Sequence, residues 1–165
     1  MTKLLNSCLF TLDKTRHLLT TLEDTQLTDK SVAPYYSSIG SHIRHILDFY
    51  NCIVNEKNNQ VNLMSRDRNL EVERSCTKAL EYLDALEEAL NGMNPEEDRI
   101  LVVTDDLGSG VLNLRYTFGA LMAQANSHTI HHYAIINYIL EQLGVSMEDS
   151  RFGFNPTTPL LTKSE

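Results

Sequence analysis

Histidine clusters are the feature of this sequence best suited to chemistry. Five of the six histidines lie in two groups, His42 with His45, and His128 with His131 and His132. His128 and His132 are four residues apart, so on a helix their Cβ atoms lie about 6 Å apart on one face. Two imidazoles at that spacing can bind one cation together, and the spacing is typical of metal-binding helices.

The pair His128 and His132 admits two interpretations. Helical phase places both inside the apolar stripe of the last predicted helix and places His131 at its edge. A buried imidazole needs hydrogen-bond partners, and burial disfavours its charged form. A shared metal ion satisfies both imidazoles, but so do hydrogen bonds within a core. The helix alone leaves both interpretations open.

The first cluster offers a third nitrogen ligand. His42 and His45 are three residues apart, and helical phase favours His42 as the more inward of the two. Either one, with His128 and His132, gives three ligands and leaves at least one coordination position open, as in catalytic sites. Asp48 is the candidate catalytic residue, as an acceptor for an imidazole N–H or for a metal-bound water. A solvated helix position is the alternative for Asp48.

Composition and charge argue against several classes of function. The net charge of −8 disfavours a protein that binds nucleic acid through its phosphates. Thr129 stands where a metalloprotease helix carries its glutamate base, which argues against peptide hydrolysis of that kind. The sequence contains no run of about 18 apolar residues, so we expect no membrane span. Three widely spaced cysteines favour a reducing compartment, and we expect a cytoplasmic protein.

The apolar pattern predicts four helices that position these histidines. Apolar residues recur at steps of three and four in four segments, residues 5–22, 39–53, 72–90 and 118–144. Ser37 or Ser38 is expected to cap the second helix and Thr117 the fourth. Narrow apolar seams of this kind are typical of helices packed side by side in a bundle.

A short stretch before the last helix has the pattern of strands. Residues 100–104 are rich in β-branched side chains, residues 105–110 hold two glycines and two aspartates, and residues 111–116 alternate. We expect a loop at 55–62 and an extended coil after Ser146. The prediction is an all-α fold, a four-helix bundle with a small β-hairpin inserted before the last helix, in a single domain of residues 1–165.

Four segments resemble motifs of the DinB/YfiT-like family. Residues 38–48 read SIGSHIRHILD and resemble its second-helix motif, and residues 127–134 read SHTIHHYA and resemble its fourth-helix motif. Residues 66–73 read RDRNLEVE and are similar to the run that opens the third helix in one branch. The tail at 152–158, FGFNPTT, is similar to a C-terminal signature of that branch.

The resemblance implies a four-helix bundle that binds one divalent metal ion, nickel or zinc, through three histidines. In the family motif the second-helix ligand precedes an aspartate by three residues, which here selects His45 with Asp48. The other two ligands correspond to His128 and His132. Helical phase favours His42 on the second helix, whereas the resemblance implies His45. We select His45, because the metal site in such bundles lies to one side of the apolar seam, towards an open mouth.

The resemblance also implies a function. Characterised relatives include metal-dependent transferases and isomerases that use low-molecular-weight thiols such as bacillithiol, mycothiol or glutathione, and others are described as hydrolases. We therefore expect a metal-dependent thiol S-transferase or hydrolase that acts on a small molecule, forms a homodimer, and has no nucleic-acid or membrane partner. The alternative is a non-enzymatic, metal-stabilised binding or dimerisation module.

Overall fold

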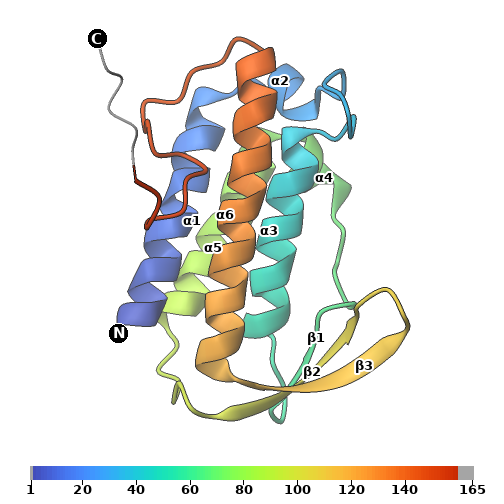
Figure 1. Ribbon diagram of the computed structural model, residues 1–165, viewed down its shortest axis with the longest axis vertical. Helices are drawn as coiled ribbons and strands as arrows, with labels where there is room; N and C mark the ends of the chain where they lie inside the picture. The colour runs from blue at the N-terminus through green and yellow to red at the C-terminus, as the bar shows by residue number, and fades with distance from the viewer. Residues whose placement is uncertain (1, 160–165) are drawn as a thin grey trace.

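The chain folds into a mostly helical structure with one small sheet (Figure 1). The computed structural model describes residues 2–159. Within them lie the helices α1 (Lys3–Thr21), α2 (Asp24–Thr28), α3 (Ile39–Val54), α4 (Leu70–Arg74), α5 (Cys76–Asn91) and α6 (Phe118–Gln142). The strands are β1 (Gln60–Asn62), β2 (Ile100–Asp106) and β3 (Val111–Thr117). No helix in the described part of the chain has the length and apolar character needed to cross a membrane.

The four long helices pack side by side around a shared apolar core. α1 contacts α5 and α6, and α3 contacts the same two helices, so each long helix has two long neighbours. Ser38 caps α3 by accepting a hydrogen bond from the Ser41 N–H, and Thr117 caps α6 in the same way from Ala120. Both caps agree with the sequence prediction, and they set where the two histidine-bearing helices begin.

The sheet lies at one end of these helices, at the bottom of Figure 1. β2 and β3 form the predicted antiparallel hairpin, with Ile100 opposite Thr117. The Asp106 carboxylate accepts hydrogen bonds from the N–H groups of Gly108 and Gly110, both at positive φ, and so fixes the tight turn. Because β3 runs directly into α6, the hairpin anchors the start of that helix.

Two sequence predictions need correction. The predicted loop at 55–62 contains β1, which pairs in parallel with β2. The predicted third helix is interrupted, because Ser75 is extended and separates α4 from α5. The Asp24 carboxylate of α2 accepts a 2.7 Å hydrogen bond from the Cys76 N–H and so supplies the N-terminal cap of α5. Both differences depend on contacts between segments that are far apart in the sequence.

The start of α3 packs closely against α4. A Cβ placed on Gly40 would lie 2.1 Å from the carbonyl oxygen of Glu73, so any larger residue there would force the two backbones apart. Glycine at this position therefore allows α4 to lie against the helix that carries His42 and His45.

The segment after α6 folds back over α6 and α1. Phe152 is buried and stacks on Tyr133 of α6, with ring centroids 4.7 Å apart. The Tyr133 hydroxyl donates a 2.8 Å hydrogen bond to the Thr11 carbonyl of α1. Lys14 of α1 forms an ion pair with Asp149 of the tail. These contacts hold α6 against α1. Two of them involve Tyr133, which directly follows His132 in the sequence.

The tail is expected to stabilise the fold through Phe152. Replacing Phe152 with Ala removes a buried ring and should lower the free energy of unfolding by about 3–5 kcal/mol in urea denaturation. Phe154→Ala is the matched control, because this ring is 44% exposed, and its cost should stay below about 1 kcal/mol. Equal losses in the two variants would contradict the packing described for the tail.

Candidate metal centre

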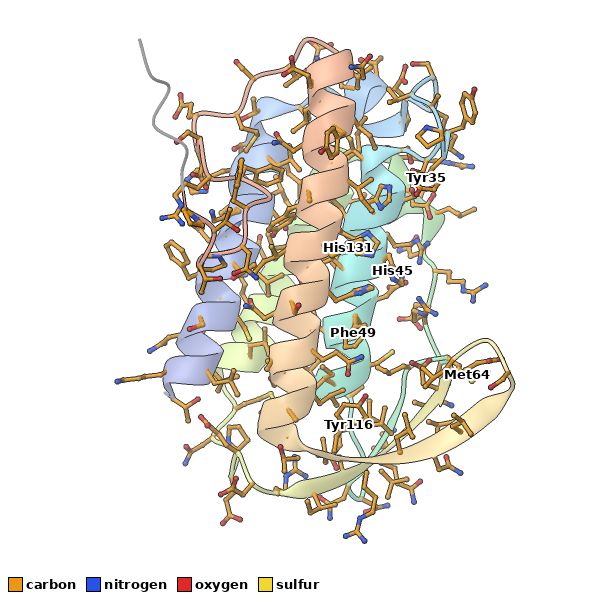
Figure 2. All side chains as sticks on the ribbon, in the orientation of Figure 1. Tyr35, His45, Phe49, Met64, Tyr116 and His131 are labelled. Carbon is orange, nitrogen blue, oxygen red and sulfur yellow. The ribbon has the colours of Figure 1, made fainter. Side chains whose placement is uncertain are left out.

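Two helices bring three histidines together. His45 lies on α3, while His128 and His132 lie one turn apart on α6, and one ring nitrogen of each lies within 4.8 Å of the others. His128 Nε2 is 2.8 Å from His45 Nε2 and 3.1 Å from His132 Nε2. Figure 2 shows His45 and Phe49 on the part of α3 that lies beside α6. The three residues that the family resemblance selected are thus adjacent in space.

The contacts among these nitrogens suit a cation better than hydrogen bonds. A neutral imidazole nitrogen carries either one hydrogen or one lone pair. His128 Nε2 has two nitrogen neighbours and can satisfy only one of them with a single linear hydrogen bond. A tetrahedral ion with bonds of about 2.0–2.1 Å would hold its nitrogen ligands about 3.3 Å apart. The two distances at His128 Nε2, 2.8 and 3.1 Å, lie within about half an ångström of that separation, so these contacts fit a shared zinc ion.

The electrostatic environment keeps these imidazoles neutral. Burial, followed by repulsion from His128, lowers the pKa of His45 to about 4 and that of His132 to about 3. Burial is also the main reason why the pKa values of His42 and His128 are lowered. Metal binding requires the neutral imidazole, so the site has the protonation state that a metal ion needs at neutral pH.

His42 lies behind His132 and outside the group of three. Its Nδ1 is 2.8 Å from His132 Nδ1, and its Nε2 is 2.8 Å from Ser37 Oγ. Two tautomer assignments satisfy both contacts. In one, Ser37 O–H donates to His42 Nε2 and His42 Nδ1–H donates to His132 Nδ1. In the other, which metal binding requires, His132 Nδ1–H donates to His42 Nδ1 and His42 Nε2–H donates to Ser37. This assignment leaves the lone pair of His132 Nε2 free for a metal, so His42 orients a ligand.

Helical phase favoured His42 as the inward residue, whereas the structure places His45 in the group of three. The reason is geometric. The three nitrogens meet between α3 and α6, away from the centre line of the apolar face of α3. His42 still contacts the group, but through the outer nitrogen of His132.

Asp48 has partners other than those expected from the sequence. Its buried carboxylate accepts hydrogen bonds from Arg44 Nη1 at 2.7 Å and from the Tyr82 hydroxyl at 3.2 Å. Arg44 also pairs with Glu73, so the network joins α3 to α4 and α5. Among residues 2–159, the hydrogen bonds of the Asp48 side chain include none to a histidine. The expected bond to an imidazole is therefore not observed, and a catalytic role for Asp48 stays a prediction.

The sequence analysis did not predict three contacts that surround the site. Arg66 Nη1 lies 2.7 Å from His45 Nδ1, Ser37 bonds to His42, and Tyr82 bonds to Asp48. The Arg66 and Tyr82 contacts join segments that are far apart in the sequence, whereas Ser37 lies only five residues before His42. Only the pairing of Arg44 with Asp48 had a local signal, because oppositely charged residues four apart on a helix meet on one face.

His131 and Phe49 border the group without belonging to it. His131 is exposed, and its ring centroid is 6.5 Å from that of His128. Phe49 is buried, and its ring centroid is 5.3 Å from that of His128, so it forms an apolar wall beside the imidazoles.

A helical protein with three neutral histidines converging between two of its helices has the arrangement of a metal-binding protein. In a comparison with known families, the model of the DinB superfamily matches residues 9–136. The chain therefore belongs to the DinB superfamily. Comparisons with curated proteins and with solved structures found no match.

The pairing of Asp48 with Arg44 predicts a structural effect for its removal. Asp48→Ala leaves Arg44 half-paired inside the protein and should lower the free energy of unfolding by about 3 kcal/mol. Asp84→Ala is the control, since the Asp84 side chain is 61% exposed in its ion pair with Arg16, and its cost should stay under about 1 kcal/mol. Urea denaturation of both variants measures the difference. An Asp48→Ala variant as stable as the native chain would contradict the role given to this network.

Proposed function

We propose that this DinB-superfamily protein binds one divalent metal ion, zinc or nickel, through His45, His128 and His132 and acts as a metal-dependent enzyme. The proposed scaffold is a four-helix bundle, with α3 and α6 supplying the ligands. The observation that carries the proposal is the convergence of three neutral Nε2 atoms from these two helices.

The ligand set supports an open coordination site. Three protein ligands leave at least one position for a water molecule or a substrate atom, as in catalytic zinc sites. A divalent ion there would lower the pKa of a bound water or thiol and make it a nucleophile near neutral pH. A thiol is a suitable ligand for zinc or nickel, so the proposed chemistry is thiol transfer or hydrolysis.

The residues of the chain have defined tasks in this proposal. His42, held by Ser37, orients His132 and accepts its Nδ1–H when His132 Nε2 binds the metal, through two 2.8 Å contacts. Phe49 excludes water from one side of His128. The Asp48 network holds α3 against α4 and α5. It thereby keeps His45 level, along the helix axis, with the two ligands on α6.

Metal content tests the ligand set directly. Protein purified without a chelator or an affinity tag should contain about one divalent ion per chain by elemental analysis. His128→Ala removes the imidazole that contacts both of the others and should reduce the content to near zero. His131→Ala is the matched control on the same helix and should retain the metal. A native chain without metal, or a His128→Ala variant that keeps it, would rule out the proposed site.

Activity distinguishes an enzyme from a metal-stabilised binding module. Metal-loaded native protein should catalyse thiol conjugation or hydrolysis in a broad substrate screen, and His128→Ala should lose that activity. Loss of the metal-bound nucleophile should lower the rate by at least about a hundredfold. A metal-loaded protein that is inactive across the screen and binds no thiol, but melts at a lower temperature after metal removal, would support the non-enzymatic alternative.

A further inference from the structure

Arg66 holds His45 in a tautomer that disfavours metal binding. The residue lies in the loop between β1 and α4, and its Nη1 is 2.7 Å from His45 Nδ1. A guanidinium group only donates hydrogen bonds, so His45 Nδ1 must accept. The single hydrogen of the neutral ring then lies on Nε2, which is the nitrogen that meets His128. His132 differs, because its contact with His42 is compatible with a free Nε2 lone pair.

A metal ion on His45 Nε2 would reverse this arrangement. Binding through Nε2 leaves the hydrogen of the neutral ring on Nδ1, where it would face the N–H of Arg66 at 2.7 Å. Two donors cannot share that contact, so the guanidinium must move. The metal ion and Arg66 therefore need His45 in different tautomers.

Within the described part of the chain, no acidic side chain forms an ion pair with Arg66. The ion pairs among residues 2–159 include Arg16, Arg44 and Arg99, but not Arg66. Its Nε is buried and has no hydrogen-bond partner among the described residues. The neighbouring Asp67 has a contact with Asn51, at 3.4 Å. The positively charged guanidinium can therefore take an anionic partner without breaking an ion pair within residues 2–159.

The charge around the three histidines favours an anion. The group contains no carboxylate, and the nearby Asp48 is already paired with Arg44 and Tyr82. A divalent ion on three neutral imidazoles beside Arg66 would give a positive site within a chain of net charge −8. The planar fork of arginine matches the two oxygens of a carboxylate or phosphate.

We propose that Arg66 and the metal ion compete for His45, and that metal binding releases the Arg66 guanidinium to bind an oxyanion group of the substrate. This inference rests on the proposed metal site, and it assigns the substrate class as small molecules that carry a carboxylate or phosphate. Arg66 is thereby a positioning residue for His45 in the metal-free protein and a substrate-binding residue in the loaded one.

Zinc affinity tests the competition. In a titration against a chromophoric chelator, Arg66→Met should tighten zinc binding about tenfold, the lower end of the effects that residues behind metal ligands have. Arg66→Gln should bind zinc more tightly still, because its amide oxygen can accept the hydrogen on His45 Nδ1. Arg68→Met removes the same charge from an exposed side chain of the same loop and should leave the affinity unchanged.

The variants separate the possible causes. Unchanged or weaker zinc binding in Arg66→Met would overturn the inference. Equal tightening in Arg66→Met and Arg66→Gln would also overturn it, because that result would reflect charge repulsion alone. A native chain that binds no zinc would instead refute the metal site on which the inference rests.

Anion binding tests the second half of the proposal. Calorimetric titration of the zinc-loaded native protein with acetate or inorganic phosphate should show binding at least about tenfold tighter than in zinc-loaded Arg66→Met, as loss of a charge-assisted hydrogen bond requires. Tighter binding of acetate would identify a carboxylate as the preferred group, and tighter binding of phosphate would identify a phosphate. Equal affinities in the native protein and Arg66→Met would contradict an anion-binding role for Arg66.

Discussion

The site depends on one constraint: α3 and α6 lie side by side, and their offset along the helix axes is fixed. His45 and His128 come from different helices, yet their Nε2 atoms lie 2.8 Å apart. A slip of one helical turn, about 5.4 Å, would separate them beyond the reach of a single ion. The rest of the fold serves to prevent that slip, through contacts on both helices that do not involve the histidines.

Each helix is held by its own set of contacts. On α3, the buried Asp48 carboxylate binds Arg44 and Tyr82, and Gly40 allows α4 to pack directly on the helix backbone. On α6, the hairpin leads into the first turn, while Tyr133 and Phe152 fix the helix against α1 and the tail. The carboxylate that the sequence suggested for catalysis is thus part of the support for the site.

The sequence predicted the features that depend on local periodicity. Helical spacing located the four long helices and placed His128 and His132 on one face, because both patterns repeat within a single element. It failed where distant segments meet: Asp24 caps α5 at Cys76, and β1 joins β2. Helical phase also favoured His42 over His45, since phase describes one helix and the nitrogens meet between two. Arg66 reaches His45 only through the folded loop, so no local pattern could identify it.

The position of a bound metal ion tests the central claim most directly. A crystal of the zinc-loaded protein, measured at the zinc absorption edge, should show one anomalous peak about 2.0–2.1 Å from the Nε2 atoms of His45, His128 and His132. Asp48 should remain bonded to Arg44 and Tyr82 in that crystal. The absence of a peak among these three nitrogens, or a peak on the Asp48 carboxylate or on His42 instead, would contradict the account.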